Sequence, residues 1–417
     1  MTRVAVVGGG AIGLCTAQAL TRRGAEVVVL ERDAFGGGAS EGNAGWITPG
    51  LSSPIPAPGV VAQALRWMFD RESPFLVRPR MDPSFLGWCV SFWRACSASR
   101  HASGLEATLR LAETSLDAFD RLAAYGVTFE MHSDGLLYLV REERSVDAWV
   151  TMYDELLALG FDGGATVFDD AAVHAFEPAI NGGVAGGVLG RHERHVRPET
   201  LTSGLCAWLR DRGADLRERT PVSGLMRERD GWTVTTPSAD VRADKVVLAA
   251  GVWTRDLLDG IGVRIPLEAA KGYSITASNG STAPRRPLYL TEIKVGASPF
   301  NGAMRLAGTL ELGVRDLRID PRRVDAIVRG AGEYLADWRP TRRRVDWAGL
   351  RPLLPDCVPL IDAVPGHGGA FAATGHGMLG ITLAPATGEA LAPLVLDGER
   401  VSALSGLGFE RLRGGRR

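Results

Sequence analysis

The sequence predicts an α/β protein in which a Rossmann-like dinucleotide-binding domain is interleaved with an α+β domain built on an antiparallel sheet. Three observations support this. The chain opens with a strand–glycine–helix–strand unit, strands of the same buried type recur only at residues 245–249 and 371–374, and residues 264–312 alternate in polarity between turns.

The opening unit carries the strongest signal. Residues 3–7 (RVAVV) and 26–30 (EVVVL) are short apolar runs typical of strands that are buried on both faces. Between them, Gly8, Gly10 and Gly13 form GxGxxG at the start of a helix predicted over residues 14–23, and Glu31 follows Gly13 by 18 residues. This context predicts a dinucleotide site, because glycines permit the tight turn and close approach while the acid binds ribose hydroxyls.

The rest of the chain is assigned in order. A loop rich in Gly, Ser and Pro over residues 32–58 separates the opening unit from the following helices, and loops of that length are usually functional. Helices are predicted at 60–69, 84–98, 106–125, 146–159, 200–212, 321–335 and 383–396, and strands at 127–131, 136–140, 232–236, 245–249 and 371–374.

Two features favour FAD among the dinucleotides. Glu31 would repel the 2′-phosphate of NADP, and the chain leaves the first sheet after Glu31 instead of completing a consecutive NAD-type unit. The segment GHGMLG (residues 375–380) also matches GxGxxG. It is interpreted as amides directed at one end of the same cofactor, with a second dinucleotide site as the alternative.

Composition excludes several classes of protein. The 417 residues carry 47 basic and 48 acidic side chains, which disfavours nucleic acid as a partner. The sequence contains no run of 18 apolar residues, so no membrane span is predicted. Five scattered cysteines without CxxC and seven histidines without ligand spacing predict reduced thiols and no metal site. We therefore expect a cytoplasmic protein.

The sequence resembles the FAD-dependent D-amino-acid dehydrogenases of the small-subunit type, within the D-amino-acid oxidase and glycine oxidase superfamily. The resemblance covers nearly the whole chain, and the segments that carry it are VAVVGGGAIG with Glu31, GNAGWITPG, PAPGVVAQALRWMF, KGYSIT, WAGLRPLLPD and TGHGMLGITLAPATG. It implies noncovalent FAD and oxidative deamination of a D-amino acid or related small amine by hydride transfer to flavin N5. The resulting imine would hydrolyse to a 2-oxo acid.

The resemblance also implies which residues form the site. The cofactor residues would be Gly8, Gly10, Ala11, Ile12, Gly13, Glu31, Arg32, Ser40, Asn43, Ala44, Gly45, Trp46, Val222, Ala250, Gly251, Trp253, Gly375, His376, Gly377, Met378, Leu379, Gly380, Ile381 and Thr382. The substrate residues would be Arg351, Tyr273, Trp46, Leu51, His376 and Lys294, with the guanidinium of Arg351 binding the substrate carboxylate. A structural ion pair for Arg351, a core position for Tyr273 and a helix-start role for His376 are the alternatives.

Leu51 and Ile293 stand where relatives often carry tyrosines. These departures leave open a flavin enzyme that acts on an unconventional amine or biosynthetic intermediate. The electron acceptor is undefined (quinone, O2 or other), and no group in the sequence is assigned as a catalytic acid or base.

The predicted FAD-binding domain comprises about 1–58, 145–255 and 345–417, and the substrate domain comprises about 59–144 and 256–344. In the substrate domain, the aromatic helix predicted at 84–98 is flanked by arginines. Either it packs on the substrate domain or it makes peripheral contact with the inner face of the membrane.

Overall fold

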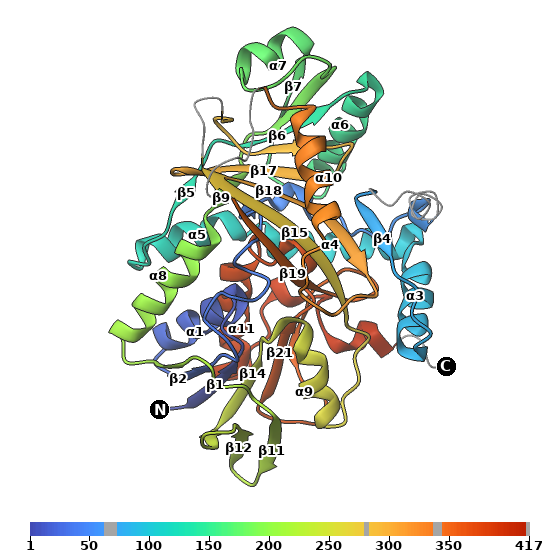
Figure 1. Ribbon diagram of the computed structural model, residues 1–417. Coiled ribbons are helices and arrows are strands. Elements are labelled where there is room, and N and C mark those ends of the chain that lie inside the picture. The colour runs from blue at the N-terminus through green and yellow to red at the C-terminus, as the bar shows by residue number, and fades with distance from the viewer. Residues whose placement is uncertain (62–72, 279–282, 337–343, 414–417) are drawn as a thin grey trace.

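A computed structural model describes residues 1–61, 73–278, 283–336 and 344–413. In this part of the chain, two large sheets lie one above the other and the chain crosses between them repeatedly (Figure 1). The lower sheet has six strands and the upper has nine, and each has its own apolar core. The α/β class and the interleaved arrangement predicted from the sequence are therefore confirmed.

The six-stranded sheet is built around the predicted opening unit. Its order is β10-β2-β1-β14-β21-β20, and all neighbours are parallel except β20 and β21. The strands are β1 (Arg3–Val7), β2 (Glu26–Leu30), β10 (Asp215–Arg217), β14 (Lys245–Leu248), β20 (Leu360–Ala363) and β21 (Ala370–Thr374). The late return of the chain through β14 and β21 agrees with the prediction.

Both faces of this sheet are covered, which explains its continuous apolar strands. Helices α1 (Ala11–Arg22), α8 (Pro198–Asp211) and α11 (Ala384–Asp397) pack on one face. A three-stranded sheet of β11 (Gly224–Glu228), β12 (Gly231–Thr235) and β13 (Val241–Ala243) contributes Trp232, 1% exposed, to the core on the other. Helix α9 (Thr254–Gly260) follows η2 (Gly251–Trp253).

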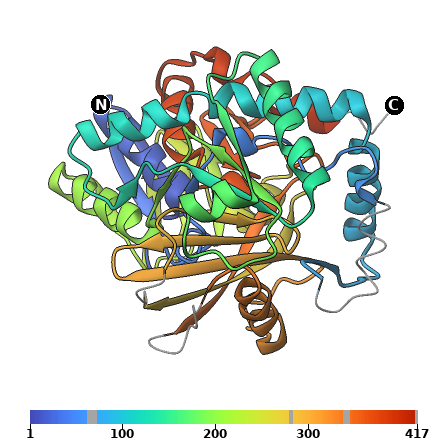
Figure 2. The ribbon, with the colours of Figure 1, turned by 90° about the horizontal axis from the view of Figure 1, so that it is seen from above.

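The nine-stranded sheet is mostly antiparallel, as predicted for residues 264–312. Its order is β19-β15-β18-β17-β16-β6-β8-β7, and β4 pairs with β18. The strands are β4 (Phe75–Val77), β6 (Leu136–Val140), β7 (Ala165–Asp169), β8 (Gly186–Gly190), β15 (Glu268–Ser278), β16 (Leu288–Leu290), β17 (Val295–Phe300), β18 (Ala303–Leu312) and β19 (Val345–Leu353). Figure 2 shows α10 (Pro321–Gly332) on the outer side of this sheet.

Sheet membership differs from the predicted domain ranges in two places. Strands β7 and β8 fall in the predicted segment 145–255, and β19 begins the segment 345–417, yet all three belong to the nine-stranded sheet. The reason is strand pairing, because β8 hydrogen-bonds to β6 and β19 to β15 over its whole length. We propose that the second domain includes these strands.

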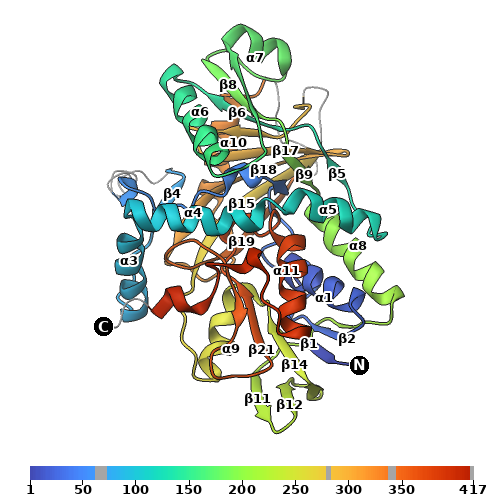
Figure 3. The same ribbon diagram turned by 180° about the vertical axis from the view of Figure 1, so that it is seen from behind.

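Of the remaining elements, α4 (Ala98–Ala112) and α5 (Ser115–Ala124) lie between the two sheets, while α6 (Glu143–Ala158) and α7 (Asp170–Phe176) lie beside the upper sheet (Figure 3). The predicted helix 106–125 is wrong in extent: it is two helices, α4 and α5, with a break where the hydroxyl of Thr114 donates to the carbonyl of Leu111. The strand predicted at 127–131 shortens to β5 (Met131–His132), which joins β3 (Trp46–Ile47) and β9 (Arg194–Val196). Other elements are α3 (Pro83–Ala95), η1 (Pro49–Leu51), η3 (Gly377–Leu379), η4 (Ser402–Leu404) and η5 (Phe409–Arg413).

The predicted helix at 60–69 lies almost wholly outside the described residues. Among the helices that the structure describes, none combines the length and apolar character needed to cross a bilayer.

Candidate active site

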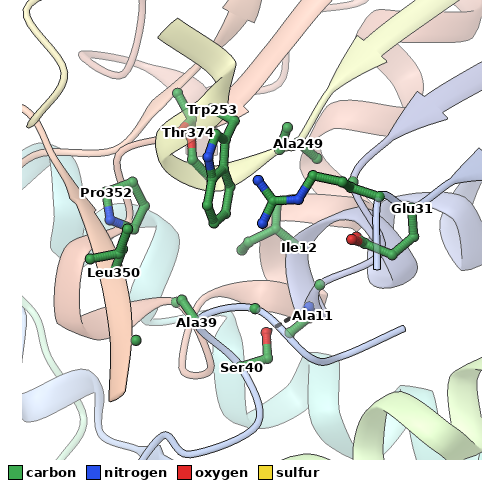
Figure 4. Close-up of a pocket in the computed structure, with 18 of the residues that line it drawn as sticks. Ala11, Ile12, Glu31, Ala39, Ser40, Ala249, Trp253, Leu350, Pro352 and Thr374 are labelled. Carbon is green, nitrogen blue, oxygen red and sulfur yellow. Dashed lines mark hydrogen bonds between the residues drawn. The ribbon is translucent and has the colours of Figure 1, made fainter. Parts of the chain in front are cut away.

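A pocket lies where the two sheets meet, and it is lined by three separate segments of the chain together with Leu317 (Figure 4). Trp253 and Thr374 stand opposite Ala39 and Ser40, while Leu350 and Pro352 lie at the end remote from Glu31. Of the predicted residues, it is lined by Gly8, Gly10, Ala11, Ile12, Glu31, Arg32, Ser40, Asn43, Val222, Ala250, Gly251, Trp253, Arg351, His376, Gly377, Gly380 and Ile381.

The glycine turn makes one wall of the pocket. Gly8 has φ +111°, a conformation that favours glycine, and a Cβ on Gly13 would stand 1.9 Å from the carbonyl oxygen of Gly8. Gly10 caps α1 without a side chain, and the hydroxyl of Ser40 accepts from the amide of Ala11 at 3.0 Å. The next amides of α1 have no intrahelical partner, so the helix start presents donors and partial positive charge to an anion.

Glu31 directly follows β2, beside this turn. Its carboxylate accepts from the backbone amides of Gly9 at 2.6 Å and Asp33 at 2.9 Å, which fixes its position in the pocket wall. The guanidinium of Arg32 stacks over the ring of Trp253, 3.9 Å from its centroid. These contacts place an acid and a flat cation–aromatic pair next to the start of α1.

The second glycine segment lines the same pocket from the opposite side of the sheet end. It connects β21 to α11, and α11 begins only at Ala384, so the strand–turn–helix context of a second dinucleotide site is missing. His376 bonds through Nε2 to the hydroxyl of Thr387 at 3.1 Å, and burial lowers its pKa to about 3. His376 is therefore a neutral group at neutral pH. The side chain of Thr387 in α11, and not a backbone group, bonds to its Nε2.

Arg351 lies on β19 at the pocket, with little of its charge compensated. Its Nη1 donates to the carbonyl of Thr309 at 2.9 Å, and among the described residues no carboxylate pairs with it. Burial lowers the pKa of Arg351 to about 10, so it is still a cation at neutral pH. A partly buried cation without a carboxylate partner is a candidate site for an anion, because leaving such a charge unpaired is costly.

Tyr273 is not placed in the pocket, and this corrects the prediction. Successive residues of a strand point to opposite faces, so Tyr273 on β15 faces away from Arg351, which shares a face with Gly272. Its ring belongs to the core of the nine-stranded sheet, and its hydroxyl donates to Glu311 at 2.9 Å. The core alternative for this tyrosine is the one that the structure supports.

Other predicted residues stand near the pocket without lining it. The indole of Trp46 donates to the hydroxyl of Ser298 at 2.9 Å and meets the ring of Tyr289 edge-on, with the centroids 5.5 Å apart. Leu51 packs in the same apolar cluster, and the ammonium of Lys294 lies 5.9 Å from the ring centroid of Tyr289. The predicted residues Gly13, Ala44, Gly45, Gly375, Met378, Leu379 and Thr382 also do not line the pocket.

Sequence reasoning missed several lining residues. Thr374, whose hydroxyl donates to the carbonyl of Gly251 at 2.9 Å, and the β19 residues beside Arg351 lie within or next to segments that carried the resemblance, so adjacency could have found them. Leu317, in the connection after β18, has no sequence signal. The others include Asp33, Ala39, Pro221, Ser223, Asp256 and Leu257.

A buried acid supports the turn that carries Leu51. Glu193 is 2% exposed, and its Oε1 accepts from the amide of Gly50 at 3.0 Å and lies 3.4 Å from the hydroxyl of Tyr153. Burial raises the pKa of Glu193 to about 8 from its ordinary value near 4.5. The carboxyl group is therefore protonated in the folded protein at neutral pH.

This raised pKa predicts a pH-dependent stability. The folded state keeps the proton that the unfolded state releases, so the free energy of unfolding should fall as pH rises from about 4.5 to about 8, by up to ~1.4 kcal/mol per pH unit. Glu193→Gln cannot ionise and should flatten this part of the profile in urea denaturation. The exposed Glu399→Gln is the control, and parallel profiles for wild type and Glu193→Gln would refute the assignment.

The fold and the pocket define a class of dinucleotide-dependent proteins. At one end of the pocket the start of α1 has no side-chain cap, and at the other Arg351 has no carboxylate partner among the described residues. The chain belongs to the FAD dependent oxidoreductase family, whose model matches residues 3–394.

Similar proteins agree with this family. The chain is 34% identical over 403 residues to a D-amino acid dehydrogenase of Xylella fastidiosa (strain M12), covering 94% of this chain and 92% of that protein. Its fold is similar to glycine oxidase from Geobacillus kaustophilus, with a TM-score of 0.76, 20% identity and 98% of both chains covered. It is also similar to L-proline dehydrogenase from P. horikoshii, with a TM-score of 0.73, 19% identity and 98% of both chains covered.

The residues present fit FAD. The turn that contains Gly8, Gly10 and Gly13, called the glycine cradle below, depends on the absence of side chains, because a Cβ on Gly8 would meet the carbonyl oxygen of Ala249 at 2.4 Å. The start of α1 offers donors suited to a pyrophosphate. The elongated pocket joins this cradle to the second glycine segment and Arg351.

Proposed function

We propose that this protein uses FAD to deaminate a D-amino acid or a related small amine oxidatively. The observation that carries the proposal is Arg351, a partly buried cation without a carboxylate partner among the described residues, in the same pocket as the glycine turn. A guanidinium presents parallel N–H donors that match a carboxylate, so an amino acid supplies the missing anion. The name of the Xylella relative supports the same substrate class.

The chain's own residues would bind and orient. The glycine cradle and the start of α1 would hold the pyrophosphate, Glu31 the ribose hydroxyls, and the backbone amides around Gly377 and Gly380 the flavin's pyrimidine edge. Arg351 would fix the substrate carboxylate and so direct the Cα–H bond. FAD supplies the chemistry of hydride acceptance when bound, and the imine product hydrolyses to a 2-oxo acid and ammonia.

An anaerobic bleaching screen tests the proposal. D-amino acids, glycine derivatives and imino acids are added to the purified flavoprotein without oxygen, with L-amino acids as the matched set. Loss of the flavin absorbance band with a D-amino acid and appearance of the 2-oxo acid are expected. No bleaching by any amine that carries a carboxylate would contradict it, and oxygen uptake compared with reduction of a quinone analogue would identify the electron acceptor.

We also propose that FAD is held without a covalent bond. The pocket lining offers backbone amides, Glu31 and the Arg32–Trp253 pair for reversible contacts, and its histidine, His376, is bonded to Thr387. Acid precipitation should leave the flavin in the supernatant, which is measured by its absorbance. Flavin that stays with the precipitated chain would contradict this.

Peripheral membrane contact is proposed through α3. Leu86 and Val90 are each 47% exposed and Trp93 is 64% exposed, and they follow one another at helical spacing on one face, near Arg94. Trp93→Glu should reduce co-sedimentation with vesicles that contain anionic lipid. The control is Met226→Glu, which alters an equally exposed apolar residue on β11. Equal binding by both variants and wild type would exclude α3 as the contact.

A further inference from the structure

The guanidinium of Arg351 lies directly against a glycine of the neighbouring strand. Gly272 on β15 stands opposite Gly349 on β19, and a Cβ built on Gly272 would be 2.0 Å from Nη1 of Arg351 and 2.4 Å from both Cζ and Nη2. Any side chain at this position would occupy the volume of the guanidinium. The absence of a side chain at Gly272 is therefore what gives Arg351 its present position.

The backbone of Gly272 does not itself require glycine. Its φ is outside the left-handed region that favours glycine, and it sits in a regular run of pairs between β15 and β19. Glycine weakens a strand, because it costs more conformational entropy and offers nothing to pack. Gly272 also lies at the register shift between β15 and β18, where glycine is common, but the guanidinium lies closer to it than a Cβ would allow.

A second contact fixes the same group from β18. The pairing of β15 with β18 shifts between Lys271 and Tyr273, and within this irregularity Thr309 has φ +65°. That conformation is uncommon for a β-branched residue. The carbonyl of Thr309 accepts from Nη1 of Arg351 at 2.9 Å, so a strained backbone position supplies the only protein acceptor recorded for this guanidinium among the described residues.

We infer that Gly272 is a positioning residue that sets substrate specificity through Arg351, with the Thr309 carbonyl as the second support. The contact with Gly272 fixes the plane of the guanidinium, and the carbonyl of Thr309 accepts a hydrogen bond from Nη1. The remaining N–H donors of Arg351 are therefore directed to a single carboxylate. The inference rests on the proposed function, and it assigns the preference for amino acids over simple amines to the contact between Gly272 and Arg351.

Gly272→Ala separates positioning from folding. The atoms that a methyl group would displace are the end of a long, flexible side chain and not backbone, so we expect the variant to fold and to retain flavin. Gly224→Ala is the matched control: Gly224 lies on β11, its φ is also outside the left-handed region, and the nearest atoms to its Cβ are 3.9 Å away. The substrates are the best D-amino acid from the bleaching screen and its primary amide.

The expected result is a loss of discrimination. Gly272→Ala should lower kcat/KM for the amino acid at least tenfold, mainly through KM, and should leave kcat/KM for the amide within twofold. It should also weaken the perturbation of the flavin spectrum by propionate, a carboxylate that cannot react. Gly224→Ala should behave as wild type in each measurement.

A double-mutant cycle decides whether Gly272 acts through Arg351. In the Arg351→Ala background the guanidinium is gone, so adding Gly272→Ala should not change kcat/KM further. An equal loss in both backgrounds would overturn the inference, because the glycine would then serve the sheet alone. The inference would also be overturned if Gly272→Ala still discriminated fully between the amino acid and its amide while Arg351→Ala did not. In that case the proposed function would stand. Discrimination that survives Arg351→Ala would overturn the proposed anchor itself.

Discussion

Arg351→Ala should leave FAD bound and cut turnover of an amino-acid substrate by about 30-fold to several thousandfold. Truncating one partner of a buried, hydrogen-bonded charge pair costs about 2–5 kcal/mol, at about 1.4 kcal/mol per tenfold. Misorientation of the substrate adds to this loss. The measurement is kcat/KM together with the ratio of flavin to protein after gel filtration.

Arg351→Lys is the informative companion. Lysine keeps a positive charge but offers a point charge in place of a planar fork, so it should also lose most of the activity. A neutral analogue of the substrate, such as the primary amide, should be oxidised equally by wild type and both variants. Equal loss on the acid and the amide would instead assign Arg351 a role in folding.

Gly13→Ala should abolish flavin retention and lower the melting temperature substantially. The new Cβ would lie 1.9 Å from the carbonyl oxygen and 3.0 Å from the carbonyl carbon of Gly8, both backbone atoms. Helix α1 would have to move away from β1, which disrupts the cradle and the core; overpacking of this kind costs about 1–3 kcal/mol and occasionally more.

The matched control for this substitution is Gly87→Ala in α3. A Cβ on Gly87 meets nothing within 4 Å, and alanine favours a helix over glycine by about 1 kcal/mol. The control should therefore be neutral or stabilising. A Gly13→Ala protein that is as stable and as yellow as wild type would show that α1 does not need its close contact with the turn.

The cofactor half of the site could be predicted because its chemistry is local in sequence. Gly8, Gly10, Gly13 and Glu31 lie within one strand–turn–helix–strand unit, where spacing alone specifies geometry. The second glycine segment was assigned to the same cofactor because its backbone amides suit one end of that cofactor, and residues of this segment do line the same pocket. Both inferences depend on short-range patterns, which do not depend on how distant strands pair in the fold.

The substrate half was less predictable because it depends on pairing between distant strands. Tyr273 and Gly272 are adjacent in sequence, yet the pleat directs the tyrosine into the core and puts the glycine beneath Arg351, about 80 residues away in sequence. Nothing local in KGYS indicates which face meets the pocket. The membership of β7 and β8 in the upper sheet was missed for the same reason, since it follows from pairing with β6.

The pocket's walls come from residues 7–43, 221–257 and 348–381, with Leu317 between the last two. During synthesis on a ribosome, the glycine turn emerges long before the wall that carries Gly380 and Ile381. Ligand binding stabilises only a state that can bind. Flavin supply should therefore determine the lifetime of the completed polypeptide, while the nascent chain must rely on its own cores or on chaperones until that last wall is in place.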